Sequence, residues 1–111
     1  MIRVLVADHQ PIVSYGIRML FENSTDIKII NTTSTAKQLL EYLKKSNTDI
    51  VLMSIDLTDI NGITVLRTIK KEFRGVAVIV FSTHPEDIYA ISAIKAGASG
   101  YLSKSVTTAT I

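Results

Sequence analysis

Acidic, hydroxyl and basic side chains follow the apolar runs of this sequence at the points where those runs end. Asp8-His9 comes after the first run, Ser54 with Asp56 after the third, Ser82 after the fourth and Lys104 after the fifth. If the runs are parallel strands, their carboxyl ends meet at one edge of a sheet, so we expect these side chains to lie close together. An acid, hydroxyls and a lysine converging from several strands suit phosphate chemistry.

Five short apolar runs, rich in β-branched residues, supply the predicted strands. Runs that are apolar throughout are typical of strands buried on both faces, as in a parallel sheet covered by helices. The predicted strands are Arg3–Ala7, Ile27–Asn31, Ile50–Ser54, Val76–Phe81 and Gly100–Leu102.

Helical patterns separate these strands. Pro11 reads as a first-turn proline and Thr35 with Gln38 has capping-box spacing, while Pro85 opens a later helix that Gly97 closes as a left-handed cap. The expected buried stripes are Val13, Ile17 and Leu20; Ala36, Leu39, Leu40 and Leu43; Ile63, Leu66, Ile69 or Lys70, and Phe73, ended by Gly75; and Ile88, Ile91 and Ile94.

The alternation of strands and helices within 111 residues predicts one α/β domain, 1–111. We expect a flavodoxin-like, doubly wound, five-stranded parallel sheet of order 2-1-3-4-5 with right-handed crossovers. Ser105–Ile111 reads as the start of a fifth helix that is truncated, so we expect the chain to be the N-terminal part of a longer regulator. A missing helix would leave apolar sheet surface uncovered, which favours self-association.

Composition excludes several classes of function. The net charge is +2, but the basic residues are scattered, so this segment is not expected to bind DNA itself. The absence of cysteine excludes disulfides, thiol chemistry and zinc–thiolate sites. Neither a secretory signal nor an apolar run of membrane-spanning length is present, which predicts a cytoplasmic protein without a membrane partner.

Four stretches of the sequence resemble the receiver domains of NarL/LuxR-type response regulators. The resemblance covers essentially the whole chain and is most specific at its end. The stretches are Ile2–Asp8 with Pro11 and Gly16, Asp49–Met53 with Asn61-Gly62, Val78–Ser82, and Ala96–Lys104.

The resemblance implies a phosphorylation switch. In that family, carboxylates hold a divalent metal ion, one of them accepts a phosphoryl group, a lysine and a hydroxyl contact the phosphoryl oxygens, and an aromatic residue reports the state. By position, Asp8 matches the first acid, Ser82 the hydroxyl, Tyr101 the aromatic and Lys104 the lysine.

Three positions depart from the family pattern. Ser54 stands at the phospho-acceptor position, His9 where the second acid and main metal ligand belongs, and Thr58 where the following loop carries proline. A hydroxyl cannot form an acyl phosphate. Asp8 and Lys104 leave the pocket formally neutral (−1 and +1, with His9 neutral), so we expect Mg²⁺ binding to be weak or absent, with no metal site and no cofactor.

We therefore hypothesise that Lys104 pairs with Asp8 or hydrogen-bonds Ser54, which fills the metal's role internally and locks the geometry without adding stability. Other interpretations stay open. Ser54 can satisfy a strand-end backbone group, make another contact or be phosphorylated as a serine. Asp56 is a substitute acceptor only in principle, since its spacing to Gly62 is wrong.

The remaining pocket residues also have simpler interpretations. His9 is either a hydrogen-bonded pocket residue or, with His84 and Asp8, part of a metal site. Tyr101 is either a packing aromatic at a strand edge or the switch, and Ser82 can be a helix-entry hydroxyl.

The sequence thus predicts an atypical, phosphorylation-independent receiver domain of a two-component-type transcription regulator, which is not an enzyme. It would act through a partner protein, a small ligand or homodimerisation through its fourth helix, fifth strand and fifth helix, and it would reach DNA only through a helix-turn-helix domain outside this chain. One alternative is a working metal-dependent phospho-acceptor, which needs a carboxylate nucleophile. Another is a flavodoxin-like cofactor module, which the glycine-free turn at Asp8–Pro11 disfavours.

Overall fold

Strands and helices alternate along the chain as the sequence predicts. The computed structural model describes residues 1–54, 57, 61–82 and 92–103. Its elements are β1 (Ile2–Ala7), α1 (Pro11–Leu20), β2 (Ile27–Thr33), α2 (Ala36–Lys45), β3 (Ile50–Ser54), α3 (Gly62–Glu72), β4 (Ala77–Ser82) and β5 (Gly100–Ser103). Residues 92–95 are also helical.

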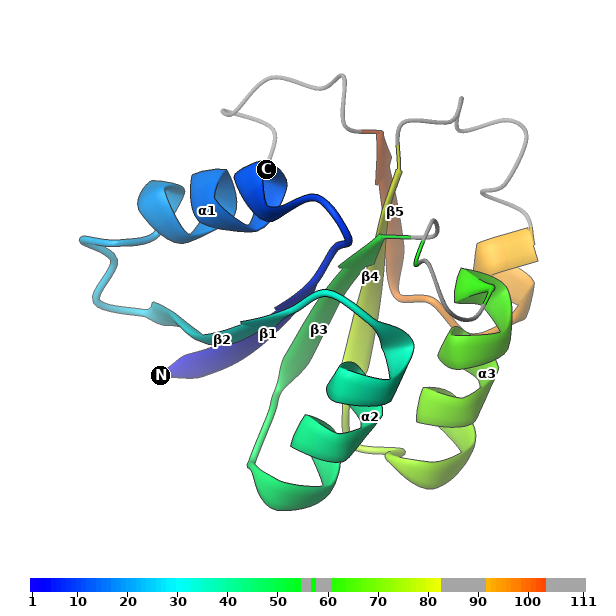
Figure 1. Cartoon of the computed structure of the whole chain (residues 1–111). Coiled ribbons are helices and arrows are strands. Elements are labelled where there is room, and N and C mark those ends of the chain that lie inside the picture. Colours follow the sequence, from blue (N-terminus) through cyan, green and yellow to red (C-terminus); the bar gives the residue numbers. More distant parts are fainter. Residues whose placement is uncertain (55–56, 58–60, 83–91, 104–111) are drawn as a thin grey trace.

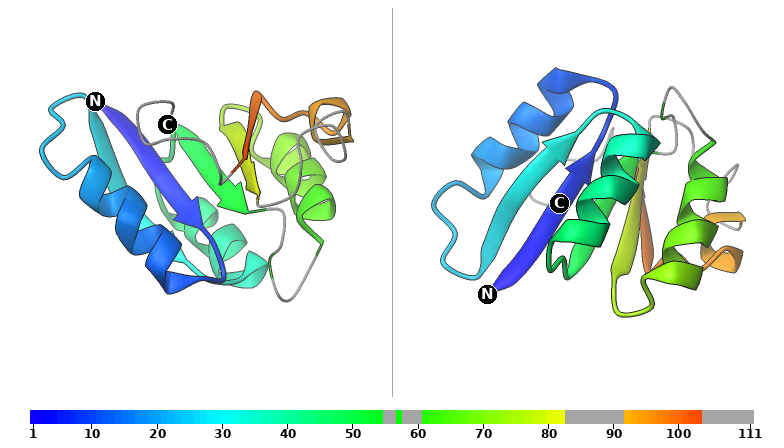
Figure 2. Two further views of the ribbon diagram at one scale, coloured as in Figure 1. Left: turned by 90° about the horizontal axis from the view of Figure 1, so that it is seen from above. Right: turned by 60° about the horizontal axis from the view of Figure 1, so that its bottom comes forward.

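The five strands form one parallel sheet of order β2-β1-β3-β4-β5, which confirms the predicted flavodoxin-like topology (Figure 1). α1 lies on one face of this sheet, and α2 and α3 lie on the other (Figure 2). β2 is an edge strand, and its pairing with β1 is interrupted by a bulge at Ile30, because Val4 pairs with Ile29 but Leu5 pairs with Asn31. Such bulges protect an open sheet edge from further pairing.

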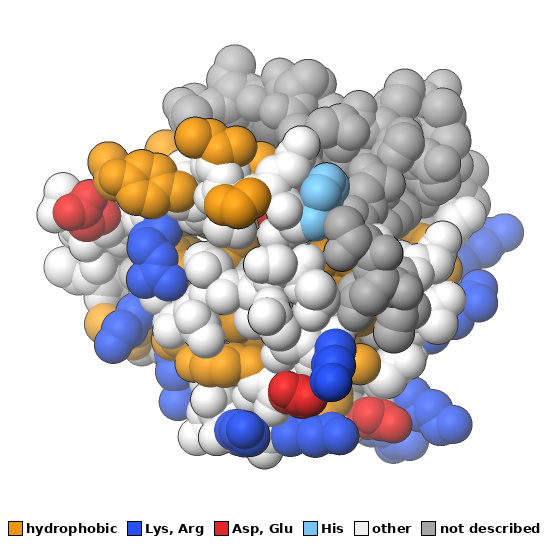
Figure 3. Space-filling model, viewed as in Figure 1, with side chains coloured by type: hydrophobic (Ala, Val, Ile, Leu, Met, Phe, Trp, Pro, Cys, Tyr) orange, Lys and Arg blue, Asp and Glu red, His pale blue; other side chains and the backbone are white. Residues whose placement is uncertain are grey.

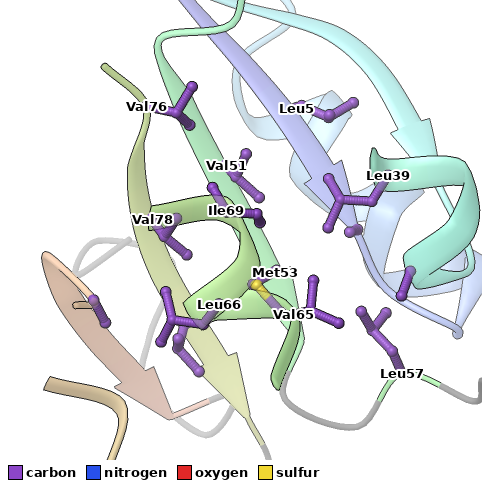
Figure 4. Packing of buried hydrophobic residues seen from close by; sticks show 14 of the residues in the cluster. Leu5, Leu39, Val51, Met53, Leu57, Val65, Leu66, Ile69, Val76 and Val78 are labelled. Atoms are coloured by element: carbon purple, nitrogen blue, oxygen red, sulfur yellow. The ribbon is translucent and has the colours of Figure 1, made fainter. Parts of the chain in front are cut away.

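Alternation along the strands sends side chains into two cores. Leu5 and Met53 point into the larger core under α2 and α3, which includes Leu39 and Leu66 (Figure 4). Their neighbours along the strands, Val4, Val6 and Leu52, point to the opposite face of the sheet and pack with Ile17 of α1. Both faces of the central strands are therefore buried, which explains why the strand runs are apolar throughout.

The helix starts agree with the sequence signals. Pro11 opens α1, and the Thr35 side chain accepts a hydrogen bond from the Gln38 N–H at the start of α2, with Thr35 Oγ1 and Gln38 N 3.2 Å apart. Gln38 in turn accepts from the Ser34 N–H (2.8 Å), one residue before the cap. Asn61 begins α3 by accepting from the Ile63 N–H (2.8 Å).

Gly97 closes the fourth helical segment in a left-handed conformation, with φ of +110°, as predicted. The Gly97 N–H donates to the Ile94 carbonyl and the Ala98 N–H to the Ala93 carbonyl, which is the Schellman pattern. A Cβ on Gly97 would lie 2.7 Å from Lys70 Cγ, so the α3 lysine packs where only glycine leaves room.

Two of the predicted stripe residues that the structure describes are exposed. Leu20 is 46% exposed, because the buried face of α1 is centred on Ser14 and Ile17 and is completed by Phe21 beyond the helix end. Ile94 is 53% exposed, since the inner position of its turn is taken by the small, fully buried Ala93. The predicted beginning of the fourth helix (85–91) and the fifth helix (105–111) lie outside the described residues.

An ion pair ties β1 to β3 at the opposite end of the sheet from the predicted site. The Asp49 carboxylate accepts hydrogen bonds from the backbone N–H (2.8 Å) and the guanidinium Nε (3.3 Å) of Arg3. The backbone hydrogen bond from Arg3, followed by the side-chain one, holds the pKa of Asp49 below its usual value. Both side chains remain about two-fifths exposed, so solvent screening keeps the effect small.

The pKa of Asp49 predicts a difference in acid sensitivity. A carboxyl whose folded pKa is lowered stabilises the fold above its unfolded pKa, about 3.9, and loses that contribution as the pH falls through the folded value. Asp49→Asn keeps an acceptor for Arg3 but loses the charge. We expect the two free energies of unfolding in urea to differ by a constant amount near neutral pH and to converge below about pH 4. Parallel pH profiles would contradict this assignment.

None of the helices in the described ranges has the length and apolarity that a membrane crossing demands.

Candidate functional site

The strand register brings the predicted site residues to one edge of the sheet. Ala7 pairs with Met53, so Asp8 and Ser54, the next residues of their chains, emerge at neighbouring strand ends. Ser54 pairs with Phe81, and Ser82 then pairs with Ser103. The carboxyl ends of the four strands β1, β3, β4 and β5 therefore converge, as the first expectation from the sequence required.

Asp8 is fixed in place by both its backbone and its side chain. Its backbone N–H donates to the Thr33 carbonyl (3.0 Å), which extends the pairing of β1 with β2 by one step. Its Oδ1 accepts a hydrogen bond from the Gln10 N–H (2.8 Å), directly before α1 begins. With only 3% of its surface exposed, Asp8 is a buried carboxylate that orients the first turn of α1.

His9 lies beside this carboxylate without forming a hydrogen bond to it. Nδ1 of His9 is 3.7 Å from Oδ1 of Asp8, which is beyond hydrogen-bonding distance. Within the described part of the chain, this buried nitrogen has no hydrogen-bond partner. About a third of the His9 side chain is exposed, so the imidazole lies at the mouth of the site.

Ser54 is buried at the end of β3, with 1% of its surface exposed. Alternation along the strand places it on the same side of the sheet as Leu52, the side that α1 covers. Met53 before it and Phe81 beside it are also buried. A carboxylate at this position would be a buried charge needing a cation or several hydrogen-bond donors, whereas a hydroxyl is neutral and small.

Tyr101 packs inward from β5. Its side chain is partly buried against the core under α2 and α3. Its hydroxyl is shielded from solvent and makes no hydrogen bond with the residues that the structure describes. The packing interpretation of Tyr101 thus has a structural basis, and its role as a switch stays a prediction.

Of the remaining predicted site residues, the structure gives the backbone position of Ser82 and does not describe the others. Ser82 ends β4 at the expected edge, and its backbone pairs with Ser103. Asp56, Thr58, His84 and Lys104 lie outside the described residues. The predicted pairing of Lys104 with Asp8 or Ser54 and the exclusion of Asp56 as an acceptor therefore stay predictions.

The structure adds two polar residues that sequence reasoning missed. Ser14 and Thr33 are buried next to Asp8 and line a cleft of about 300 Å³ between α1 and the end of β2, together with Pro11, Tyr15, Arg18, Thr32 and Ser34. Thr33 donates from its hydroxyl to the Val6 carbonyl (3.3 Å). The sequence signal that could have revealed Ser14 is the occurrence of a serine in the middle of the otherwise apolar inner stripe of α1.

The donors that the structure describes do not fit a magnesium ion. Mg²⁺ requires oxygen ligands in near-octahedral geometry and favours carboxylates. Asp8 offers a carboxylate, but its neighbour His9 offers an imidazole and Ser54 a neutral hydroxyl. Among the described residues, no three histidine, aspartate or glutamate side chains are grouped closely enough to hold a metal ion.

The fold is a doubly wound parallel sheet with Asp8 and Ser54 at neighbouring carboxyl ends of its strands. Residues 4–111 match the response regulator receiver domain family, and the chain belongs to it. This match, together with the LuxR-family structure described below, confirms the resemblance to NarL/LuxR-type receivers and the assignment to two-component response regulators.

Individual relatives are consistent with this family. The chain is 34% identical over 101 residues to the Fimbriae Z protein of Escherichia coli K12 and 32% identical over 104 residues to the response regulator UvrY of the same strain, covering 91% and 94% of this chain. It spans about half (48%) of each of those proteins. Among solved structures, a LuxR-family two-component response regulator from Aurantimonas sp. SI85-9A1 superposes with a TM-score of 0.89 at 30% identity, over 96% of this chain and 76% of that one.

Proposed function

We propose that this receiver domain works without phosphorylation, as the regulatory part of a transcription regulator. The observation that carries the proposal is Ser54, a buried hydroxyl at the position where the family has its phospho-acceptor. Acyl phosphate formation needs a carboxylate nucleophile at that point. His9 supports the same conclusion, because it removes the second acid from the neighbouring strand end.

A domain of this kind still has conformations whose populations can be shifted. Since phosphate is not the input, a ligand, a protein partner or self-association must bind one conformation better than another. We propose that the chain is cytoplasmic, is not an enzyme, functions as a homodimer or with a protein partner, and reaches DNA through a region corresponding to the other half of its longer relatives. Lys104, paired with Asp8 or hydrogen-bonded to Ser54, would hold the site in a fixed geometry.

The test is exposure of the chain to small phosphodonors. With acetyl phosphate and Mg²⁺ we expect no added phosphoryl group in the intact mass, and with beryllofluoride and Mg²⁺ no change in amide NMR shifts around Ser54. Titration with Mg²⁺ alone should give no saturable response in the low millimolar range. Either kind of label would overturn the proposal: an acid-stable label would identify phosphoserine, and a hydroxylamine-sensitive label would identify a substitute carboxylate.

A further inference from the structure

Helix α1 buries a hydroxyl group that has no hydrogen-bond partner in the part of the chain that the structure describes. Ser14 lies on the inner face of the helix with 7% of its surface exposed, and its Oγ is shielded from solvent. An unpaired buried hydroxyl costs free energy, so such groups normally meet a protein, water or ligand partner. Ser14 lines the cleft of about 300 Å³ between α1 and the end of β2, which is where a partner can reach it.

Most residues that line this cleft carry a hydroxyl group. Thr33 is buried and donates to the Val6 carbonyl (3.3 Å), so its own oxygen can still accept hydrogen bonds. Thr32 and Ser34 also line the cleft from the end of β2, and Tyr15 adds an aromatic ring from α1. In the space-filling view, mainly uncharged polar and backbone surface separates the hydrophobic side chains over α1 from the charged ones over α2 (Figure 3). Such a recess suits a small ligand with several hydrogen-bonding groups.

Two opposite charges also line the cleft, one from each end of α1. Asp8 comes shortly before the helix, and Arg18 lies in its last turn, seven residues (18 − 11) or about 10 Å beyond Pro11. Helical side chains lean toward the N-terminus, which brings Arg18 back along the cleft. Arg18 is exposed and forms no ion pair with a described residue. The cleft therefore offers a carboxylate near one end and a guanidinium near the other.

We propose that this cleft binds a small zwitterion, a molecule of amino-acid size with one carboxylate, one ammonium group and an uncharged side chain. The ligand's carboxylate accepts from Arg18, whose guanidinium fork matches carboxylate geometry. Its ammonium group donates to the Asp8 carboxylate, which has lone pairs beyond the one that accepts from Gln10. The Ser14 hydroxyl gains a hydrogen-bond partner, and the Tyr15 ring contacts the ligand's side chain.

The pair of charges favours a zwitterion over other small ligands. A simple anion such as phosphate would pair with Arg18 but would be repelled by Asp8, and a simple cation would meet the reverse arrangement. An uncharged sugar would use the hydroxyl groups but leave both charges without a counter-charge. A ligand that carries both signs pairs with both ends of the cleft and uses the hydroxyl groups between them.

The ligand would act on the helix that begins at the degenerate site. The Asp8 carboxylate holds the Gln10 N–H directly before α1, so a zwitterion between Asp8 and Arg18 contacts both ends of this helix and can favour one position of it over another. Of the two contacts proposed for Lys104, the hydrogen bond to Ser54 is the one compatible with an ammonium group at Asp8. The inference rests on the proposed function, because it names the kind of input that replaces phosphate.

The experiment is an NMR titration of the isotope-labelled 111-residue chain with glycine, L-serine, L-valine, L-leucine and L-glutamine. We expect at least one of them to bind saturably, with a dissociation constant on the order of 0.1–1 mM for a ligand of so few atoms. The amide signals of Ser14, Thr33 and Ser34 should shift. Analogues that lack one charged group, such as isovalerate and isobutylamine in place of L-valine, should bind at least about tenfold more weakly.

Two pairs of variants test the location of the site. Arg18→Gln should weaken binding at least about tenfold, while Arg67→Gln, an equal change of charge on the exposed face of α3, should have no effect. Ser14→Ala should weaken binding about threefold or more, because the ligand loses a hydrogen bond. Its control is Thr48→Val, which removes another buried hydroxyl without a described partner, two residues before β3, and should leave binding unchanged.

Thermal melting separates a binding role of Ser14 from a structural one. A hydroxyl without a partner adds nothing to the stability of the unliganded chain, and alanine is the better helix former, so Ser14→Ala should melt no lower than the unsubstituted chain. A lower melting temperature would show that Ser14 has a structural partner and would contradict the assignment. An excess of the amino acid that binds should raise the melting temperature of the unsubstituted chain and of Thr48→Val, but not of Arg18→Gln.

Three further outcomes would overturn the inference. One is the absence of a saturable response to all five amino acids at ten times the expected dissociation constant, which would leave water as the partner of Ser14. Another is equally tight binding of an analogue without the amino or the carboxylate group, and the third is equal weakening by Arg67→Gln and Arg18→Gln. None of these measurements involves a phosphodonor, so they can fail while the proposed function, which is tested by labelling, still holds.

Discussion

Replacing Ser54 with aspartate and His9 with glutamate together is expected to give the chain a phosphate acceptor, which we propose that the unsubstituted chain lacks. Ser54→Asp supplies a carboxylate nucleophile at the end of β3, and His9→Glu supplies a second acid beside Asp8. The two substitutions add carboxylate oxygens at neighbouring strand ends, which changes the donor set to one that suits Mg²⁺. Intact mass after incubation with acetyl phosphate should show one added phosphoryl group, dependent on Mg²⁺ and removed by hydroxylamine.

The single variants separate the two contributions. Ser54→Asp alone should accept phosphate poorly, because the new carboxylate is buried next to Asp8 and still lacks the second metal-binding acid. His9→Glu alone should bind Mg²⁺ better than the natural chain but take up no phosphate. The matched control is Ser54→Asn with His9→Gln, which has similar shapes without the charges and should remain inert. A folded double variant that stays unlabelled would show that these two positions do not account for the loss of the chemistry.

The fold was largely predictable because the apolar runs, the helix caps and the alternation of strands and helices all indicate the same topology. Apolar runs such as Ile50–Ser54 are buried on both faces of a parallel sheet, and the observed strand bounds differ from the predicted ones by at most two residues. The predicted helix ends were also confirmed where a single residue determines them. Examples are the Thr35 side-chain cap and the left-handed Gly97. Consistency between local preference and global topology makes such a pattern predictable.

The site was predictable only as far as the strand ends determine it. Because strands are parallel, the convergence of Asp8, Ser54 and Ser82 follows from their positions at the ends of neighbouring strands. The buried face of α1 was not predictable to the residue, since Ser14 rather than Leu20 lies on it. Because α1 has apolar residues on both sides, its periodicity does not distinguish the inner face from the outer one to the residue. Which side of α1 packs against the sheet therefore required coordinates.

The stability of the site's framework depends on the core beneath α3. Leu66 is fully buried and belongs to the same core cluster as Met53, the residue before Ser54 (Figure 4). Leu66→Ala removes buried methyl groups and leaves a cavity, so the free energy of unfolding should fall by about 2–5 kcal/mol. Leu66→Met keeps the volume and should lower it by less than about 1.5 kcal/mol.

Leu20→Ala provides the matched comparison, because the same atoms are deleted from a side chain that is 46% exposed. Its loss of unfolding free energy should be below about 1 kcal/mol, since solvent already contacts much of the surface that the truncation removes. Urea unfolding at low micromolar concentration, where self-association does not contribute, measures all three variants. Equal losses for Leu66→Ala and Leu20→Ala would mean that the core under α2 and α3 does not hold β3 and its terminal Ser54 in place, and the geometry of the site would then need another source.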